Sequence, residues 1–465
     1  MKKNKNSRRE FLSKSTLMAT SLSLGVPYAA SASKRILGAN DKVRVGFIGV
    51  GNRGTLLLDL FMQNPSVEVA ALCDVYEPYI SRDRNVVASR YLDIGKVPKM
   101  GEKFAKQPEQ FTDFRKMLEM KDLDAVCIAT PDHWHAIQTI NALDAGLDVY
   151  VEKPLTITIK EGRAMVDAHK RSKQVVQVGL NRRGSSMYRK LHEEVKAGKI
   201  GKVTTARAMR ISNMAPNGIG NLKPEQPPKD FDWEMWLGPR PSRPYQYNIA
   251  PYFFRWWEDY SSQMGNWGVH YMDVIRWMLD EQAPIAVTAH GGKYVLTDDR
   301  TIPDTMEVFF EFASGKIVQF SIHEASGGTG IRGGEIELRG TKGNVYASQN
   351  GYNIEPAKPG QFQKWDKIEA EEVNIKSQKQ FGDLDIKENT TANLVNNFID
   401  CVKSREAPLC SLEDGHRSTS FAHLANIALK MGGRIEWDPE KERITNMKKA
   451  NDLLHYEYRD PWKLA

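Results

Sequence analysis

The sequence predicts an α/β protein of two domains, in which a doubly wound parallel sheet is followed by an α+β domain with a large, mostly antiparallel open sheet. The 465 residues are enough for two or three domains, and 41% hydrophobic with 26% charged residues is typical of a globular chain. Short apolar runs alternate with helical stretches up to about Pro154. Beyond that residue, strand-like runs are separated by glycine-containing turns, as in antiparallel sheets.

Four continuous apolar runs mark the first domain. They are VRVGFIGV at 43–50, VEVAALCDV at 67–75, AVCIAT at 125–130 and DVYVEKP at 148–154. Buried parallel strands need runs of this kind, and the stretches GTLLLDLFMQN, FRKMLEMKD and HWHAIQTINALDAG between them have helical spacing. The polar segment 85–110 is expected to be an insertion or a long loop. The alternation predicts a Rossmann-type domain over residues 40–155.

A glycine fingerprint follows the first of these strands. Gly49, Gly51 and Gly54 have the spacing G-x-G-x-x-G at the start of a helical stretch. The first glycine permits a tight turn, the second lets a pyrophosphate approach the backbone, and the third packs helix against strand. Asp74 lies 20 residues beyond Gly54, at the end of the next apolar run. Its carboxylate suits ribose hydroxyls and disfavours the extra phosphate of NADP, so the expected cofactor is NAD.

The second domain is expected over residues 156–465. Residues 160–200 have helical character, 203–212 have strand character, and a loop rich in proline and tryptophan follows over 215–260. Strand-like stretches continue to about residue 348, and helices return at 391–404 and 413–431. One face of an open sheet needs a cover other than its own helices. We therefore expect a homo-oligomer, a dimer or a tetramer, formed through this sheet.

The first 32 residues have the pattern of an export signal. A basic start with Arg8-Arg9 precedes a weakly apolar run and the small residues Ala30 and Ala32, and the whole resembles a twin-arginine signal. That pathway exports folded proteins, so a periplasmic location is expected. These residues carry six basic side chains and one acidic one, which leaves a net charge near +2 for the rest of the chain. No nucleic-acid partner and no membrane anchor are therefore expected.

Neither the cysteines nor the histidines have the spacing of a metal site. The cysteines are Cys73, Cys127, Cys401 and Cys410. The first two fall in apolar runs and are expected to be buried thiols, whereas the sequence leaves open whether the last two form a disulfide. His133 and His135 have no companion cluster of ligands, so no metal is expected.

Two segments, ATPDHWHA at 129–136 and EKP at 152–154, each end a strand-like run, where ligands of such sheets bind. With GLNRR at 179–183, GNWGVHYMDVIRWML at 265–279 and the glycine fingerprint, they resemble the Gfo/Idh/MocA family of sugar and polyol oxidoreductases. The tail with WDPEKERI resembles that of an exported bacterial branch. The resemblance covers nearly all of the chain after the leader. It implies a cofactor site that includes Thr130, Pro131, His135 and Glu152.

The same resemblance implies the residues of the reaction. Lys153 matches the family lysine between nicotinamide and substrate, where an ammonium stabilises a developing alkoxide. His270 matches the histidine that exchanges a proton with the alcohol, for which its ordinary pKa is suited. Arg183 matches an arginine on the substrate side. Trp267 is a candidate for contact with a sugar, and Asp273 either supplies a carboxylate to the substrate or orients His270.

The sequence departs from the family at Asn266, where many members have an aspartate four residues before the histidine. An amide can orient a substrate hydroxyl but cannot take a proton, which leaves Lys153 and His270 as the proton carriers. The expected activity is NAD-dependent hydride transfer from or to a sugar, a glycoside or a polyol. Because soluble NAD is not available outside the cytoplasm, the cofactor is expected to stay tightly bound.

Two other functions remain open. In a redox-neutral NAD-dependent glycosidase, as in one branch of relatives, the sugar is oxidised, loses its aglycone, adds water and is reduced again. The YPTHG-like motif of that branch is replaced here by GNWGVHYMD. The third alternative is a catalytically silent sugar-binding protein, which the presence of Asn266 allows and the presence of Lys153 and His270 disfavours.

Overall fold

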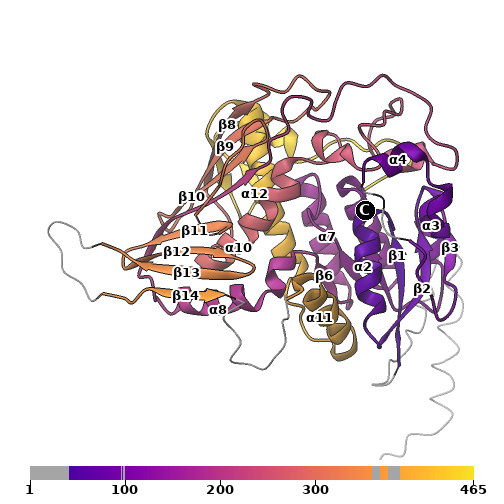
Figure 1. Cartoon of the computed structure of the whole chain (residues 1–465), viewed down its shortest axis with the longest axis horizontal. Coiled ribbons are helices and arrows are strands. Elements are labelled where there is room, and N and C mark those ends of the chain that lie inside the picture. Colours follow the sequence, from indigo (N-terminus) through magenta and orange to yellow (C-terminus); the bar gives the residue numbers. More distant parts are fainter. Residues whose placement is uncertain are drawn as a thin grey trace, which may run out of the picture. The chain divides into compact units, whose positions relative to one another are not determined.

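Two sheets form the framework of the protein (Figure 1). The computed structural model describes residues 41–95, 97, 100–332, 334–358, 367–374 and 388–464. The predicted export signal, residues 1–32, lies outside these residues. One sheet is parallel and the other is mostly antiparallel, which confirms the predicted α/β fold class.

The first sheet is parallel throughout and has the strand order β3-β2-β1-β4-β5-β6. Its strands are β1 (Val43–Ile48), β2 (Val67–Cys73), β3 (Glu109–Phe111), β4 (Ala125–Ile128), β5 (Asp148–Val151) and β6 (Val176–Val178). Strands β4 and β5 are completely buried, which explains their continuous apolar sequences. The strand order reverses between β1 and β4, and such a reversal opens a crevice at the carboxyl ends of the strands. The sheet includes β6, which lies beyond the predicted boundary at residue 155.

Helices and short turns connect these strands. They are α2 (Asn52–Met62), α3 (Glu77–Ser81), η1 (Arg84–Val86), α4 (Ser89–Asp93), α5 (Phe114–Leu118), η2 (Asp132–Trp134), α6 (His135–Asp144) and α7 (Ile159–Arg171). Helix α2 begins directly at the glycine fingerprint, as its sequence predicts. Helix α7 begins at a capping box, in which the Thr158 side chain accepts from the Glu161 backbone and the Glu161 carboxylate accepts from the Thr158 backbone.

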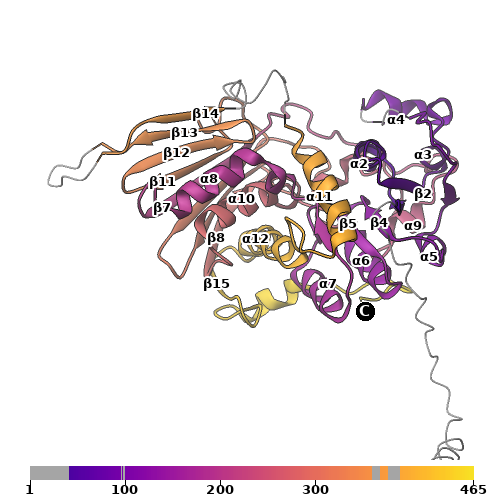
Figure 2. The ribbon, with the colours of Figure 1, turned by 90° about the horizontal axis from the view of Figure 1, so that it is seen from below.

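The second sheet has ten strands in the order β14-β13-β12-β11-β7-β10-β9-β8-β15-β16. They are β7 (Val203–Ile211), β8 (Ala286–Gly292), β9 (Thr305–Glu311), β10 (Ile317–His323), β11 (Ile336–Gly340), β12 (Gly343–Ser348), β13 (Gly351–Pro356), β14 (Glu371–Asn374), β15 (Ile435–Asp438) and β16 (Arg443–Ile444). All neighbours are antiparallel except β7 and β10, which are parallel. One face of the sheet packs against α8, α10 and α12 (Figure 2).

The remaining helical elements lie beyond residue 180. They are η3 (Asn181–Gly184), α8 (Ser186–Lys196), α9 (Trp233–Leu237), η4 (Phe253–Trp256), the π-helical turn η5 (Met264–Gly268), α10 (Val269–Leu279), α11 (Thr390–Ser404), α12 (Leu412–Met431) and η8 (Lys448–Leu454). Helices α11 and α12 agree within one residue with the predicted ranges. Helix α11 packs on α2 of the first domain, where Phe398 contacts Phe61 and Tyr150 at ring-centroid distances of 6.2 and 5.8 Å.

All four cysteines are buried as free thiols. The pairing of Cys401 with Cys410 that the sequence left open is therefore not formed in this structure. Over the described ranges, no helix is both long and apolar enough to cross a membrane.

Candidate functional site

A cavity of about 630 Å³ lies at the carboxyl ends of the parallel strands, and residues of both domains line it. The glycine turn, the ends of β2, β4 and β5, the turn η5 and the end of β7 all contribute side chains or backbone to its wall. The crevice predicted by the strand order is therefore closed over by the second domain into one continuous site.

The glycine turn is built so that no side chain fits at two of its positions. Gly49 has a φ of +84°, and a Cβ added there would lie 2.8 Å from the backbone nitrogen of Thr130. A Cβ at Gly54 would lie 1.9 Å from the Gly49 carbonyl oxygen, so the third glycine allows the close approach of helix and strand. Gly49 and Gly51 line the cavity, whereas Gly54 lies behind it. This geometry fits a dinucleotide pyrophosphate at the start of α2.

Asp74 lies at the end of β2 and lines the same cavity. Its carboxylate accepts hydrogen bonds from the backbone nitrogens of Val50 at 2.8 Å and Tyr76 at 3.1 Å. Burial raises the pKa of Asp74 to about 6, against the opposing effect of these backbone donors. The position and the acceptor chemistry suit the ribose hydroxyls of NAD, and a carboxylate here repels the additional phosphate of NADP.

Lys153 is held in the cavity by Asn266. Its Nζ donates to the Asn266 carbonyl oxygen at 2.9 Å and lies 3.3 Å from the Asn266 side-chain oxygen. The π-helical turn η5 presents both oxygens to the lysine, and such turns are frequent at functional sites. Burial lowers the pKa of Lys153 to about 8, although the carboxylates of Glu152 and Asp132 oppose this shift. The ammonium therefore titrates close to neutral pH.

The neighbouring Glu152 is neutralised by an arginine of the glycine turn. Arg53 Nε lies 2.8 Å from Glu152 Oε1, and the second carboxylate oxygen accepts from the Lys153 backbone nitrogen at 3.3 Å. Glu152 thus couples the turn to the strand end that carries Lys153. Arg53 lies within the G-x-G-x-x-G pattern, but that pattern did not indicate a role for its side chain.

His270 and Trp267 both line the cavity, next to Lys153 and Asn266. His270 is only 8% exposed, and its Nδ1 has no hydrogen-bond partner within the described part of the chain. Burial, with the positive charges of Arg182 and Lys153, lowers the pKa of His270 well below its usual value. This environment favours the neutral imidazole, in which one ring nitrogen accepts hydrogen bonds.

The structure places two predicted substrate residues elsewhere. Arg183 and Asp273 form a two-pronged ion pair with both nitrogen–oxygen distances at 2.9 Å, and Ser418 donates to the same carboxylate. Asp273 is completely buried and Arg183 is 7% exposed, and neither lines the cavity. Their charges satisfy each other in the core between α10, η3 and α12, so neither is free to contact a substrate.

Thr130 and Pro131 line the cavity, whereas His135 lies behind its wall. The two ring nitrogens of His135 contact the carbonyl oxygens of Pro154 at 2.8 Å and Thr130 at 2.9 Å. His135 therefore ties the ends of β4 and β5 together and positions the backbone on either side of the cofactor site. Thr130 donates its hydroxyl to Gln138 at 2.7 Å.

Five charged residues of the cavity wall were missed by the sequence interpretation, namely Arg53, Asp132, Arg210, Arg255 and Glu324. Asp132 is buried, and it accepts from the Ser261 hydroxyl. Arg255 packs over Tyr252, 4.4 Å from the ring centroid. Arg53, Asp132 and Arg255 lie in segments that the sequence analysis named, and Arg210 and Glu324 come from strand ends of the second domain. Across the described residues, no group of three or more His, Cys, Asp or Glu side chains could hold a metal ion.

The fold and this cavity define an NAD-binding oxidoreductase of the Rossmann type, with a second domain that covers the cofactor site. Residues 43–180 match the family model for the NAD-binding Rossmann fold of the Gfo/Idh/MocA oxidoreductases, and residues 189–349 and 375–464 match the model for their C-terminal alpha/beta domain. The chain belongs to the Gfo/Idh/MocA oxidoreductase family, as its motifs predicted.

Solved structures with the same fold include a levoglucosan dehydrogenase in complex with NADH and levoglucosan, with a TM-score of 0.60 and 17% identity. An aldose-aldose oxidoreductase from Caulobacter crescentus, complexed with glycerol, has a TM-score of 0.58 and 15% identity. Each comparison covers 85% of this chain and 99% of the other. Among curated relatives, an alpha-N-acetylgalactosaminidase of Shewanella oneidensis is 32% identical over 152 residues, or 31% of this chain. That match spans 30% of the length of the relative.

Proposed function

We propose that this protein transfers a hydride between a hydroxyl-bearing carbon of a carbohydrate or polyol and a tightly bound NAD. The observation that carries the proposal is the shared cavity. Lys153, Asn266 and His270 line the same 630 Å³ space as the glycine turn and Asp74. A substrate hydroxyl bound beside Lys153 thus lies next to the expected position of the nicotinamide, and the sugar ligands of structural neighbours support a carbohydrate.

The cofactor, when bound, accepts and returns the hydride, and this chain's residues hold the substrate and move its proton. The Lys153 ammonium, fixed by Asn266, donates to the substrate oxygen and stabilises the negative charge that develops there. The neutral imidazole of His270 accepts the hydroxyl proton during oxidation and returns it during reduction. Asn266 positions Lys153 and carries no proton, while Trp267 offers a flat ring to the substrate.

The proposal includes export of the folded protein to the periplasm with its cofactor bound, and the twin-arginine pattern of residues 1–32 supports it. Retention is also supported by the loop between α9 and η4. Its Pro251 and Tyr252 line a small pocket together with Gly51 and Asn52 of the glycine turn. The loop would lie beside a dinucleotide bound at the glycine turn and would slow its release.

A redox-neutral glycosidase is the second candidate, because the curated relatives include glycosyl hydrolase family 109 proteins and an alpha-N-acetylgalactosaminidase. In that reaction the same Lys153 and His270 serve the oxidation and the final reduction. The two functions differ in outcome, because the glycosidase releases an aglycone and leaves the bound NAD oxidised at the end of each cycle.

The first experiment is to purify the mature protein without added nucleotide and to record absorbance and fluorescence near 340 nm. A panel of free sugars, polyols and aryl glycosides is then added. Bound NAD that becomes reduced, and stays reduced until an acceptor is added, supports the oxidoreductase. Aglycone release without net reduction supports the glycosidase. Bound NAD with neither reduction nor aglycone release supports a sugar-binding protein.

We further propose that the open face of the ten-stranded sheet joins subunits of a homo-oligomer. Two apolar side chains on this face, Phe309 and Ile317, are 40% and 43% exposed, and Arg207 and Glu337 pair across it. A partner subunit would cover this mixed surface. Light scattering of the wild type and of Phe309→Glu, which places a charge in the contact, tests the arrangement.

A further inference from the structure

Arg210 is a cation at a register position that otherwise faces the core. It follows Ala206 and Ala208 on β7, two positions that are 1% exposed, and pairs with Ile322 of β10. Because successive side chains of a strand alternate between faces, Arg210 points to the helix-covered face, and at the end of β7 it enters the cavity. Its guanidinium carbon lies 3.8 Å from the centroid of the Trp267 ring, so stacking fixes the charge in place.

Among the described residues, no carboxylate forms an ion pair with this guanidinium. Two buried arginines nearby in the fold are paired, Arg182 with Glu335 at 2.8 Å and Arg276 with Asp414 at 2.6 Å. Within the described ranges, Arg210 forms no ion pair within 4.0 Å, and its buried Nε has no hydrogen-bond partner. Arg210 as a whole is half-buried, but a buried N–H group without a hydrogen-bond partner costs free energy. Its position on the cavity wall indicates that a ligand supplies the partner.

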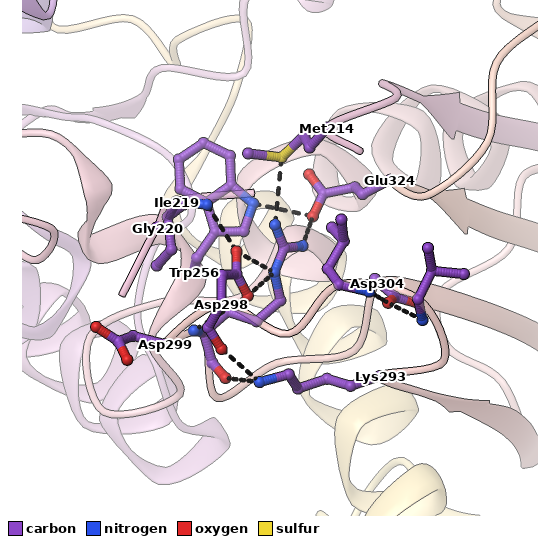
Figure 3. Close-up of polar contacts among 12 residues, drawn as sticks. Met214, Ile219, Gly220, Trp256, Lys293, Asp298, Asp299, Asp304 and Glu324 are labelled. Carbon is purple, nitrogen blue, oxygen red and sulfur yellow. Dashed lines mark hydrogen bonds and ion pairs between the residues drawn. The ribbon is translucent and has the colours of Figure 1, made fainter. Parts of the chain in front are cut away.

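The wall carboxylate that acts on Arg210, Glu324, already accepts hydrogen bonds from other side chains. Glu324 accepts from the buried Arg300 at 2.7 Å and from the indole nitrogen of Trp256 at 2.9 Å (Figure 3). Arg300 is itself paired with Asp298, and all three charged groups are at most 4% exposed. Glu324 therefore acts on Arg210 only as a nearby charge, because its hydrogen bonds go to Arg300 and Trp256.

The other acidic groups of the wall are bonded to groups of the chain. Asp132, which acts on the charge of Lys153, accepts from the Ser261 hydroxyl. Asp74 accepts from backbone nitrogens of the cofactor turn, and Glu152 is paired with Arg53. Lys153 is bonded to the neutral oxygens of Asn266, so, as far as the chain is described, Lys153 and Arg210 present two cations without a bonded carboxylate to the cavity, where the acid group of a ligand would bind.

We infer that Arg210 binds a carboxylate of the substrate, so that the carbohydrate oxidised at Lys153 is a sugar acid of the uronate or aldonate class. A guanidinium matches the planar carboxylate in shape and forms short, charge-assisted hydrogen bonds to it. In this arrangement the Trp267 ring packs against the sugar ring, Arg210 binds the acid group and Lys153 contacts the hydroxyl. This inference rests on the proposed function for its redox chemistry, but not for binding.

The test compares three ligands of one shape: methyl β-D-glucuronide, its uronamide and methyl β-D-glucoside, with the galacto series alongside. Binding to the NAD-containing protein is measured by calorimetry, and hydride transfer by absorbance at 340 nm. The variants are Arg210→Gln, Arg210→Lys and, as a control, Arg332→Gln, at an arginine whose side chain is 84% exposed. We expect at least one uronide to bind about 10-fold or more tighter than its amide and its glucoside.

Arg210→Gln should weaken that uronide about 10- to 100-fold and leave the neutral ligands within about threefold, since one charge-assisted contact is lost. Arg210→Lys should recover part of the affinity, and Arg332→Gln should leave binding of all three ligands unchanged. Equal binding of acid, amide and glucoside, equal weakening of all three by Arg210→Gln, or absence of binding by every acid would overturn the inference. Charge-selective binding with no change at 340 nm and no aglycone release would instead overturn the proposed function.

Discussion

The Nζ of Lys153 lies between the two oxygens of Asn266, 2.9 Å from the backbone carbonyl and 3.3 Å from the side-chain amide. These are neutral acceptors, so they orient the ammonium without the charge compensation that a carboxylate provides. The low pKa of Lys153, about 8, follows from burial in this environment. The pair explains how the chain holds a lysine in the reactive position although it lacks the aspartate common in its family.

Replacement of Lys153 by Met tests its part in the reaction. Loss of the ammonium removes stabilisation of the developing alkoxide, and kcat should fall about 100- to 1000-fold. NAD should still copurify, because the glycine turn and Asp74 are intact, so absorbance of bound nucleotide serves as the internal control. Lys170→Met, at an exposed lysine, should leave turnover unchanged. Turnover of Lys153→Met within a few-fold of wild type would show that the lysine has no catalytic part.

Asn266→Asp should shift the pH dependence of the reaction upward. An opposite charge close to an ammonium favours its protonated form, so the pKa of Lys153 should rise from about 8 toward the ordinary value for lysine. The limb of the pH–rate profile near pH 8 should move to higher pH in the variant. Asn266→Ala, which removes the amide without adding charge, should not raise it. An unchanged profile in Asn266→Asp would assign that limb to a different group.

Asp74→Ala should weaken retention of NAD about 10- to 100-fold, since the carboxylate no longer accepts from the ribose. Burial raises the pKa of Asp74 to about 6, so the free protein holds the charged acceptor only above that pH. Affinity for NAD should therefore decrease as the pH falls through 6 in the wild type and be flat there in Asp74→Ala. Fluorescence titration of the nucleotide-stripped protein measures both, and NADP, whose phosphate Asp74 repels, should gain relative affinity in the variant.

The parts of this site that local sequence patterns encode were predictable. Gly49, Asp74 and Lys153 each lie directly after a buried strand, and the ends of parallel strands meet at one edge whatever the rest of the fold does. Helical sequence patterns likewise predicted α11 and α12 to within one residue of their ends. These features depend on chain-local spacing, which the sequence displays directly.

The parts that depend on long-range packing were not. Arg210 enters the cavity because β7 pairs with β10 in parallel, more than 100 residues apart along the chain. The family resemblance placed Arg183 and Asp273 at the substrate. In the structure they form an ion pair with each other instead. The sequence shows which side chains are able to bind or react, but the tertiary structure determines which partner each charged side chain contacts.

The ion pair of Arg183 and Asp273 provides the last prediction. Because Asp273 is fully buried and accepts two hydrogen bonds from the guanidinium, Asp273→Asn leaves Arg183 with only the longer ion pair to Asp414, at 3.6 Å, and should cost about 3 kcal/mol in the free energy of unfolding. The midpoint of thermal unfolding should fall by several degrees, while the affinity of the folded variant for substrate stays near that of the wild type. Asp167→Asn, at an exposed aspartate whose contact with Lys170 is 3.6 Å, is the matched control and should unfold like the wild type. Should Asp273→Asn keep its unfolding midpoint and lose substrate affinity instead, Asp273 would serve the substrate, as the family resemblance had implied, and the structural assignment would be wrong.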